Sequence, residues 1–168
     1  MSRTRMVIVG AVIAVVAAAT ALPAMAAPPA SDTANQTVKF TNRASVRLTL
    51  SVPTVDFGNV DPLATYTQGG GNANVRANAN WTLTVTSPAN FSDGGANTIP
   101  LDRLSLNTNG GGYNAFSAAG GTQTIATGAA TSNAGTDNTL SYQLTLQWGD
   151  KPSANPYSAA LTYTATTP

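Results

Sequence analysis

Apolar and polar residues alternate one by one along much of this chain. The pattern covers residues 45–52, 72–78, 81–86, 140–148 and 157–166. Because the side chains of a β-strand point alternately to its two faces, each segment predicts a strand with one buried and one solvated face. Beyond residue 26, no segment carries the 3.6-residue apolar stripe of an amphipathic helix. The sequence therefore predicts an all-β protein.

Gly, Asn and Pro separate the predicted strands, as is typical of antiparallel sheets with turns between neighbours. About seven to nine such strands predict an antiparallel, immunoglobulin-like β-sandwich. We expect residues 37–168 to form it as a single domain, because this length is common for one domain. Two pairings are expected: residues 72–78 with 81–86 as a hairpin, and residues 140–148 with 157–166 across a polar turn.

The phase of the alternation predicts which side chains are buried. Trp81 and Trp148 both keep phase with neighbouring leucines, so both are expected in the core. Ile99 is out of phase with Leu104. This change of phase predicts a bulge or bend near Asp102.

The first 26 residues have the features of a secretory signal peptide. Arg3 and Arg5 precede an apolar run at residues 6–21, and Ala24-Met25-Ala26 has the small side chains of a cleavage site. An uncleaved membrane anchor is the alternative, but the run is short for a membrane span. We expect removal of residues 1–26, an extracellular protein with no membrane contact, and a flexible leader at residues 27–36.

The composition leaves few groups for catalysis. The 168 residues include no Cys, no His and no Glu, and only 9% of them are charged. Nucleophilic catalysis would need a serine beside Lys39 or Lys151, and neither lysine lies in a recognisable motif. The seven Asp residues likewise form no known catalytic pattern. We expect a protein that is not an enzyme and that needs no cofactor.

Several ligand classes are disfavoured in the same way. The eight Lys and Arg residues are scattered, which argues against nucleic-acid binding. The run Asn109–Gly112 lacks the Lys-Ser/Thr pair of a phosphate-binding loop. Asp93-Gly94-Gly95 and Asp137-Asn138 offer oxygen atoms to Ca²⁺, but a calcium loop needs several oxygens at fixed spacing. We interpret both as turns and assign no metal site.

A set of motifs follows in order along the chain. It comprises residues 50–60 with the step Asp56-Phe57-Gly58, the strand Trp81-Thr82-Leu83, and a closing strand at residues 157–165. These motifs resemble the WxL domain of Gram-positive cell-surface proteins. In that family the closing strand carries a second Trp-x-Leu motif, where this chain has Tyr163-Thr164-Ala165.

The resemblance implies a secreted protein that attaches non-covalently to peptidoglycan, or to another cell-wall glycan, beside other surface proteins. The motif residues, expected mostly in the core, are Phe57, Trp81, Leu83, Tyr157, Leu161 and Tyr163. Strand faces rich in Thr, Asn, Ser and Gln offer hydrogen bonds to a glycan. Exposed aromatic rings can stack on sugars. Because Tyr66 and Tyr113 are expected in loops, they are the candidate ligand-contacting residues.

Two other functions remain open. In residues 37–42, Val38 and Phe40 alternate with polar residues, so a short strand is expected. It either completes the protein's own sandwich or adds to the open sheet edge of another copy, which would make the protein a structural subunit of a filament or matrix. The third hypothesis is an adhesion module that binds a glycan on another cell. Nothing in the sequence separates it from wall binding.

Overall fold

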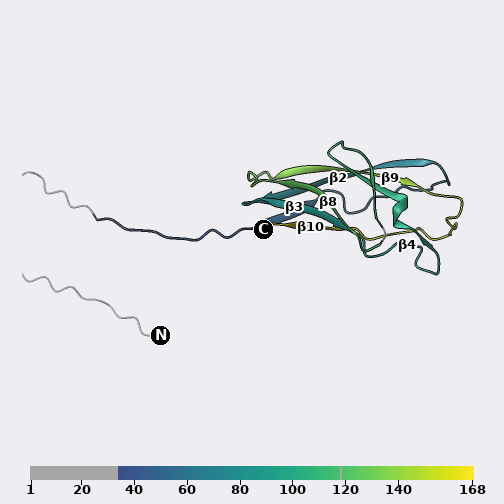
Figure 1. The fold of residues 1–168 in the computed structure, drawn as a ribbon, viewed down its shortest axis with the longest axis horizontal. Coiled ribbons are helices and arrows are strands. Elements are labelled where there is room, and N and C mark those ends of the chain that lie inside the picture. Colours follow the sequence, from purple (N-terminus) through teal and green to yellow (C-terminus); the bar gives the residue numbers. More distant parts are fainter. Residues whose placement is uncertain (1–33, 118) are drawn as a thin grey trace, which may run out of the picture. The chain divides into compact units, whose positions relative to one another are not determined.

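The computed structural model describes residues 34–117 and 119–168. The described residues fall into two units, residues 34–40 and residues 41–168. The predicted signal peptide, residues 1–26, lies outside the described residues, as does most of the predicted leader. The described residues form ten β-strands and one 3₁₀ helix, so the fold is all-β, as predicted (Figure 1). Three of the ten strands have only two residues.

The second unit contains two main antiparallel sheets, here named sheet A and sheet B. In spatial order, sheet A consists of β1 (Val46–Leu50), β2 (Thr65–Ala77), β9 (Thr136–Thr145), β6 (Leu104–Thr108) and β7 (Asn114–Ala115). Sheet B consists of β10 (Thr162–Thr166), β3 (Trp81–Thr86) and β8 (Thr122–Gly128). A separate pair, β4 (Phe91–Ser92) and β5 (Thr98–Ile99), precedes the 3₁₀ helix η1 (Leu101–Arg103).

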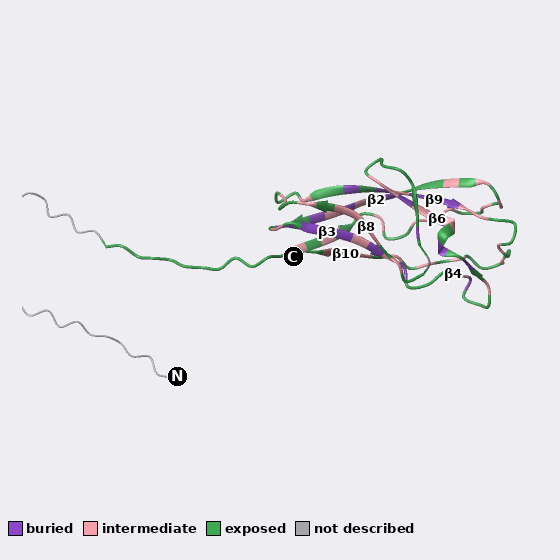
Figure 2. Ribbon diagram, in the orientation of Figure 1, coloured by how far each residue is buried: buried purple, intermediate pink, exposed green. Residues whose placement is uncertain are grey.

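The hydrophobic core lies between sheets A and B (Figure 2). Alternation explains its composition, because Trp81, Leu83 and Val85 of β3 are buried while the threonines between them are half-buried. Leu140 and Leu144 of β9 belong to the same buried cluster from sheet A. Burying one such side chain contributes about 1.5–3 kcal/mol. The predicted antiparallel sandwich is therefore confirmed.

One hydrogen bond inside the core joins the two sheets. The hydroxyl groups of Tyr142, on β9, and Tyr163, on β10, hydrogen-bond to each other. Burial raises the pKa of both phenols above the ordinary value of 10. Both therefore stay neutral, and each hydroxyl satisfies a polar atom that would otherwise be costly to bury.

The predicted hairpin of residues 72–78 with 81–86 is wrong. β2 and β3 lie in different sheets, and the connection at Asn78 carries the chain across. Asn78 Oδ1 accepts from the Ser45 N–H at 2.7 Å, and Nδ2 donates to the Arg43 carbonyl at 2.8 Å. Two alternating strands can bury their apolar faces side by side or facing each other. The period of two is the same in both arrangements.

The second predicted pairing, of residues 140–148 with 157–166, is also wrong. β10 lies beside β3 in sheet B, with Thr164 opposite Thr84. β9 instead lies between β2 and β6 in sheet A. The chain thus crosses between sheets after β9, and the polar residues that follow form the crossover instead of a hairpin turn.

Near Asp102, where a bulge or bend was predicted, the structure has the 3₁₀ helix η1. Ile99 ends β5 and Leu104 begins β6, so the change of phase separates two strands. Pro100 lies between β5 and the helix. Because proline has no backbone N–H to donate to a sheet, it favours the end of a strand at this point.

Three consecutive glycines form an irregularity within β2. The register with β9 shifts between Gly69 and Gly71, and Gly71 has a φ of +67°, a conformation that favours glycine. Gly70 lies against the ring of Tyr142, because a Cβ atom there would be 2.4 Å from the ring atom Cε2. The glycines therefore make a bulge that accommodates the tyrosine joining the two sheets.

Residues 34–40 form no strand, and all of them are exposed. Val38 is 79% and Phe40 is 89% exposed. The strand expected at residues 37–42 is not observed. Among the residues that the structure describes, no helix has the length and apolar character needed to cross a membrane.

Replacing Gly70 by alanine tests its contact with Tyr142. We expect Gly70→Ala to lower the free energy of unfolding by about 1–3 kcal/mol, because the added methyl group overlaps the ring. Gly69→Ala is the matched control, since a Cβ atom at Gly69 would have nothing within 4 Å. Urea denaturation of both variants measures the difference. Equal stability of the two variants would contradict the proposed contact.

Candidate functional site

Trp148 is an exposed residue on a tight turn. β9 ends at Thr145, and beyond it the Asp150 N–H donates to the Gln147 carbonyl at 3.0 Å. Trp148 lies between them and is 77% exposed. The prediction that it belongs to the core is therefore wrong. The alternation continues past the real end of the strand, where Gly149 and Asp150 form the turn.

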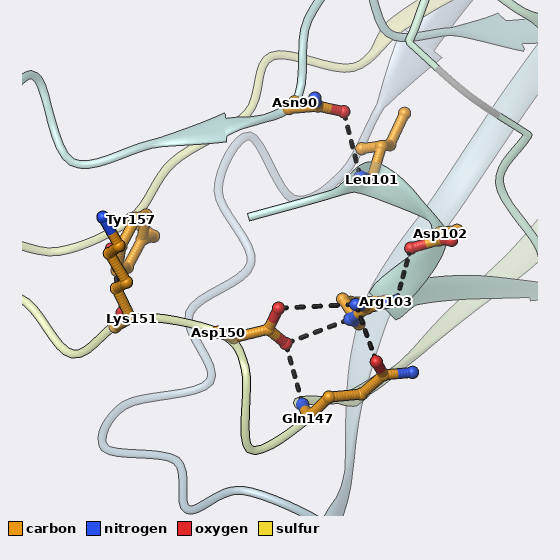
Figure 3. A network of polar contacts seen from close by, with 8 residues as sticks. All are labelled: Asn90, Leu101, Asp102, Arg103, Gln147, Asp150, Lys151 and Tyr157. Carbon is orange, nitrogen blue, oxygen red and sulfur yellow. Dashed lines mark hydrogen bonds and ion pairs between the residues drawn. The ribbon is translucent and has the colours of Figure 1, made fainter. Parts of the chain in front are cut away.

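Arg103 fixes both ends of this turn (Figure 3). Its Nε donates to Asp150 Oδ2 at 3.0 Å, and its Nη2 donates to Gln147 Oε1 at 2.9 Å. The Gln147 N–H also donates to Asp150 Oδ2, at 2.7 Å. A planar guanidinium with fixed donors suits such an arrangement. The residues that flank Trp148 are therefore held in place.

The ion pair beneath the turn is shielded from solvent. The side chains of Arg103 and Asp150 are 15% and 6% exposed. The hydrogen bond to Asp150 raises the pKa of Arg103 above its ordinary value, although burial acts in the opposite direction. Asp102 adds a second ion pair at 2.8 Å. Because solvent screens buried pairs less than exposed ones, this network gives Trp148 a rigid base.

Leu63 places a second exposed apolar side chain near this turn. Its N–H donates to the carbonyl of Leu146 at 2.8 Å, two residues before Trp148. Leu63 is 60% exposed and has a φ of +64°. A non-glycine residue in this left-handed region costs roughly 1–2 kcal/mol. Such strain is often found at functional positions.

The structure does not bring together the two candidate tyrosines, Tyr66 and Tyr113. Tyr66 lies in β2, not in a loop, and is opposite the buried Leu144, so it shares the inner face. Its hydroxyl accepts from the Asp61 N–H at 3.0 Å. Tyr113 lies in a loop, as predicted, and hydrogen-bonds to Ser141 at 2.8 Å. Positions 141 and 144 point to opposite faces of β9, so the two tyrosines contact opposite faces of sheet A.

Most of the motif residues contribute to the core. Trp81 and Leu83 are buried, as predicted. The partly buried motif residues that pack against the core are Phe57, Leu161 and Tyr163. Tyr157 lies outside this cluster, and its hydroxyl donates to the Lys151 carbonyl at 2.9 Å. These side chains therefore have structural roles in this fold.

An open hollow of about 560 Å³ lies where Trp81 begins β3. The indole covers Gly128, its cross-strand partner on β8, because a Cβ atom on Gly128 would be 2.5 Å from the ring. An aromatic ring over a glycine of an edge strand is a known way to stabilise a sheet. Polar residues around the hollow are Asn80, Thr82, Thr127 and Thr166. The buried indole N–H of Trp81 has no acceptor among the described residues.

Asp93 closes a turn and holds a distant loop. Its Oδ1 accepts from the Gly95 N–H at 2.8 Å, and its Oδ2 accepts from the side chains of Asn97 at 2.8 Å and Ser153 at 2.9 Å. The hydrogen bond from Asn97 does most to lower the pKa of Asp93 below its ordinary 3.8. Asp137 similarly accepts from an asparagine side chain at 2.7 Å. In the described part of the chain, no group of three or more acidic side chains could hold a metal ion.

The sequence patterns did not predict Arg103 and Asp150 as residues of the site. They are 47 positions apart, and no local pattern connects them. One sequence signal indicated the end of the strand. Gly149-Asp150 is a turn-forming pair, which favours a strand that ends before Trp148. The ion pair itself depends on how β6 and β9 are placed in sheet A, which the alternation does not specify.

Compared with known proteins, the chain matches no family model and no curated protein at a significant level. The candidate sites are therefore defined by their own geometry, and there are two of them. One is the exposed tryptophan on a fixed turn with a strained and exposed leucine near it, and the other is the open hollow bordered by hydroxyl groups at the start of β3.

The two tryptophans of the chain provide a test of these environments. We expect acrylamide to quench the fluorescence of Trp81→Phe, which retains Trp148, several-fold more strongly than that of Trp148→Phe. The reason is that Trp148 is 77% exposed and Trp81 only 3%. Circular dichroism of both variants confirms that the fold is kept. Similar quenching constants for the two variants would contradict the assignment.

The hydrogen bonds of Asp93 predict a pH dependence. Because the pKa of Asp93 is lower in the folded chain than in the unfolded chain, the ionised group stabilises the fold above about pH 4. This contribution disappears as the pH falls through the folded-state pKa. We expect Asp93→Asn to be less stable than wild type at pH 7, and the difference to shrink by pH 3. Thermal melts at pH 7, 5, 4 and 3 measure it, and a pH-independent difference would contradict this account.

Proposed function

We propose that this chain is a non-catalytic cell-surface protein that binds cell-wall glycan, peptidoglycan in particular, without covalent attachment. The observation that carries the proposal is the exposure of Trp148 on a turn that Arg103 fixes. The face of an aromatic ring is electron-rich and attracts the C–H groups of a sugar face. Because the turn that carries Trp148 is already held, its backbone loses less entropy when a ligand binds.

The polar groups beside Trp148 support a glycan as the ligand. Gln147 uses its Oε1 to accept from Arg103, and its NH₂ group makes no hydrogen bond to another described residue. Asp102 is also exposed. Sugar hydroxyl groups can accept from the amide and donate to the carboxylate. An exposed aromatic ring on a turn whose supporting network presents a free amide and a carboxylate therefore suits a carbohydrate better than a purely apolar partner does.

The sequence supports a cell-wall location for that glycan. The predicted signal peptide at residues 1–26 favours export, and the motifs at Phe57, Trp81 and Tyr163 resemble those of wall-attached WxL domains. In this proposal the buried motif residues maintain the fold, and Trp148 makes the contact. An adhesion module for the glycan of another cell would use the same contact.

Assembly by strand addition is the second candidate function. One observation favours it: residues 37–42 form no strand, although Val38 and Phe40 alternate with polar residues and are almost fully exposed. An exposed alternating segment can pair with the open edge of another sheet. A protein that assembles in this way should form larger species as its concentration rises.

Co-sedimentation with purified Gram-positive peptidoglycan tests the proposed function. We expect residues 27–168 to sediment saturably while remaining monomeric in size-exclusion chromatography over a concentration series. Trp148→Ala should weaken binding by at least about tenfold, as expected for an aromatic anchor. Phe40→Ala, which removes an exposed aromatic ring outside the candidate site, is the matched control and should bind like wild type.

Two results would contradict this proposal. If Trp148→Ala and Phe40→Ala bind alike, Trp148 is not the contact. If the wild-type chain does not sediment and forms oligomers as its concentration rises, strand addition is favoured. Deleting residues 27–42 should then abolish the oligomers.

A further inference from the structure

Nine threonines form a regular array on the outer face of sheet B. Thr82 of β3 lies opposite Thr166 of β10 on one side and Thr127 of β8 on the other. The intervening residues of β3, among them Leu83 and Val85, are buried, so the threonines point away from the core. The other two rows of the array are Thr164–Thr84–Thr124 and Thr162–Thr86–Thr122.

The array repeats at the spacings of a β-sheet. Neighbouring strands lie about 4.8 Å apart, and the threonines of β3 and of β10, at alternate positions, lie about 6.8 Å apart along their strands. On β8 the bulge places Thr124 and Thr127 three positions apart. The ring of a pyranose sugar is similar in size to the distance between two strands. A polysaccharide chain that crosses the strands can therefore place one ring on each threonine of a row.

The outer face of sheet B carries no charge, and many of its hydroxyl groups are unused. None of β3, β8 and β10 contains a charged residue. The outer face of sheet A differs, since Arg47 lies directly opposite Arg76. Within the array, only Thr84, Thr86 and Thr122 use their hydroxyl groups to bond another described residue. The other six hydroxyl groups can donate to and accept from a ligand.

One row of the array opens into the hollow beside Trp81. Thr82, Thr127 and Thr166 border this hollow together with Asn80. Its volume of about 560 Å³ is in the range of small-ligand sites. The hydroxyl array therefore ends at a concave place bordered by amide and hydroxyl groups, where a sugar ring can be partly enclosed.

We infer that the outer face of sheet B, with the hollow at its end, is a binding surface for an extended polysaccharide chain. This inference rests on the proposed function and adds a contact surface separate from Trp148. Thr82, Thr127 and Thr166 donate and accept the hydrogen bonds that hold the sugar hydroxyl groups. The threonines that β8 and β10 contribute to the array are exposed, so a polymer can lie along the face without entering a cleft.

A rigid crystal surface such as ice is the competing ligand for a regular threonine array. Neighbouring strands twist by about 20–25° relative to each other. The register shift between β3 and β8 at Leu83 and Thr84 marks a bulge, which increases the local twist. A flat rigid lattice cannot follow three twisted rows, whereas a glycan chain can rotate about its linkages. The twist therefore favours the polysaccharide.

The hollow at the end of the array and Trp148 lie near opposite ends of β2. The hollow is at the start of β3, shortly after β2 ends, whereas Trp148 follows the end of β9, which pairs with the start of β2 at Thr65. The 13 residues of β2 span roughly 40 Å. Two weak contacts on one polymer increase its retention well beyond either contact alone. Such a pair suits attachment to a polymeric wall without a covalent bond.

A triple substitution tests the inference. Thr82→Val/Thr127→Val/Thr166→Val removes three hydroxyl groups that bond no other described residue, and valine keeps the β-branched shape that strands favour. The control is Thr49→Val/Thr67→Val/Thr139→Val, which adds the same apolar groups to the outer face of sheet A. Both are made in residues 27–168, and circular dichroism and thermal melts check their folding.

Binding is measured with peptidoglycan and with a soluble hexamer of β-1,4-linked N-acetylglucosamine, observed by NMR. We expect the sheet B variant to bind peptidoglycan at least about tenfold more weakly, because three hydrogen bonds are lost. The control should stay within about twofold of wild type. In the wild-type chain, the hexamer should shift the methyl signals of Thr82, Thr127 and Thr166 but not that of Thr49.

Each other outcome overturns the inference in a distinguishable way. Equal losses in the two triple variants show an effect of added apolar surface, not of this face. If the sheet B variant binds like wild type while Trp148→Ala binds weakly, the array is not a binding surface, but the proposed function is retained. If the wild-type chain does not bind, both the inference and the proposed function are contradicted. If the wild-type chain binds no glycan but inhibits ice recrystallisation, and the sheet B variant loses this inhibition, the ligand of the array is ice.

Discussion

The mutual burial of the apolar faces of sheets A and B is the interaction on which the rest of the structure depends. The hydrogen bond between Tyr142 and Tyr163 joins the two sheets inside this core. Because every strand turns its apolar side inward, its polar side must face solvent. The outer surfaces, rich in hydroxyl and amide groups, follow directly from the way the core is built.

Glycines connect the packing of the core to the shape of the surface. Gly70 lies against the ring of Tyr142 and Gly128 against the indole of Trp81, so an aromatic ring occupies the space of a missing side chain in both places. At Gly70 this allows a bulge within β2. Gly128 and Trp81 both line the hollow at the end of sheet B. Residues whose own contacts are structural therefore border the proposed binding surface.

The candidate site was only partly predictable from the sequence. The exposure of Tyr113 in a loop follows from its glycine-rich surroundings, but the exposure of Trp148 contradicts its phase with the preceding leucines. Phase is informative only while the strand lasts, and β9 ends at Thr145, before Trp148. The ion pair between Arg103 and Asp150 that holds the turn beyond it joins residues far apart in the chain, so no local pattern reveals that pair.

The all-β class and the inward-facing side chains of the long strands follow from the sequence alone, because a period of two is a local property of the backbone. Which strands become neighbours depends on the tertiary structure. Side-by-side and face-to-face arrangements bury the same apolar residues, so alternation cannot choose between them. Only the placement of β10, β3 and β8 in one sheet brings Thr166, Thr82 and Thr127 into a single row. The array exists because strand pairing depends on contacts between distant parts of the chain.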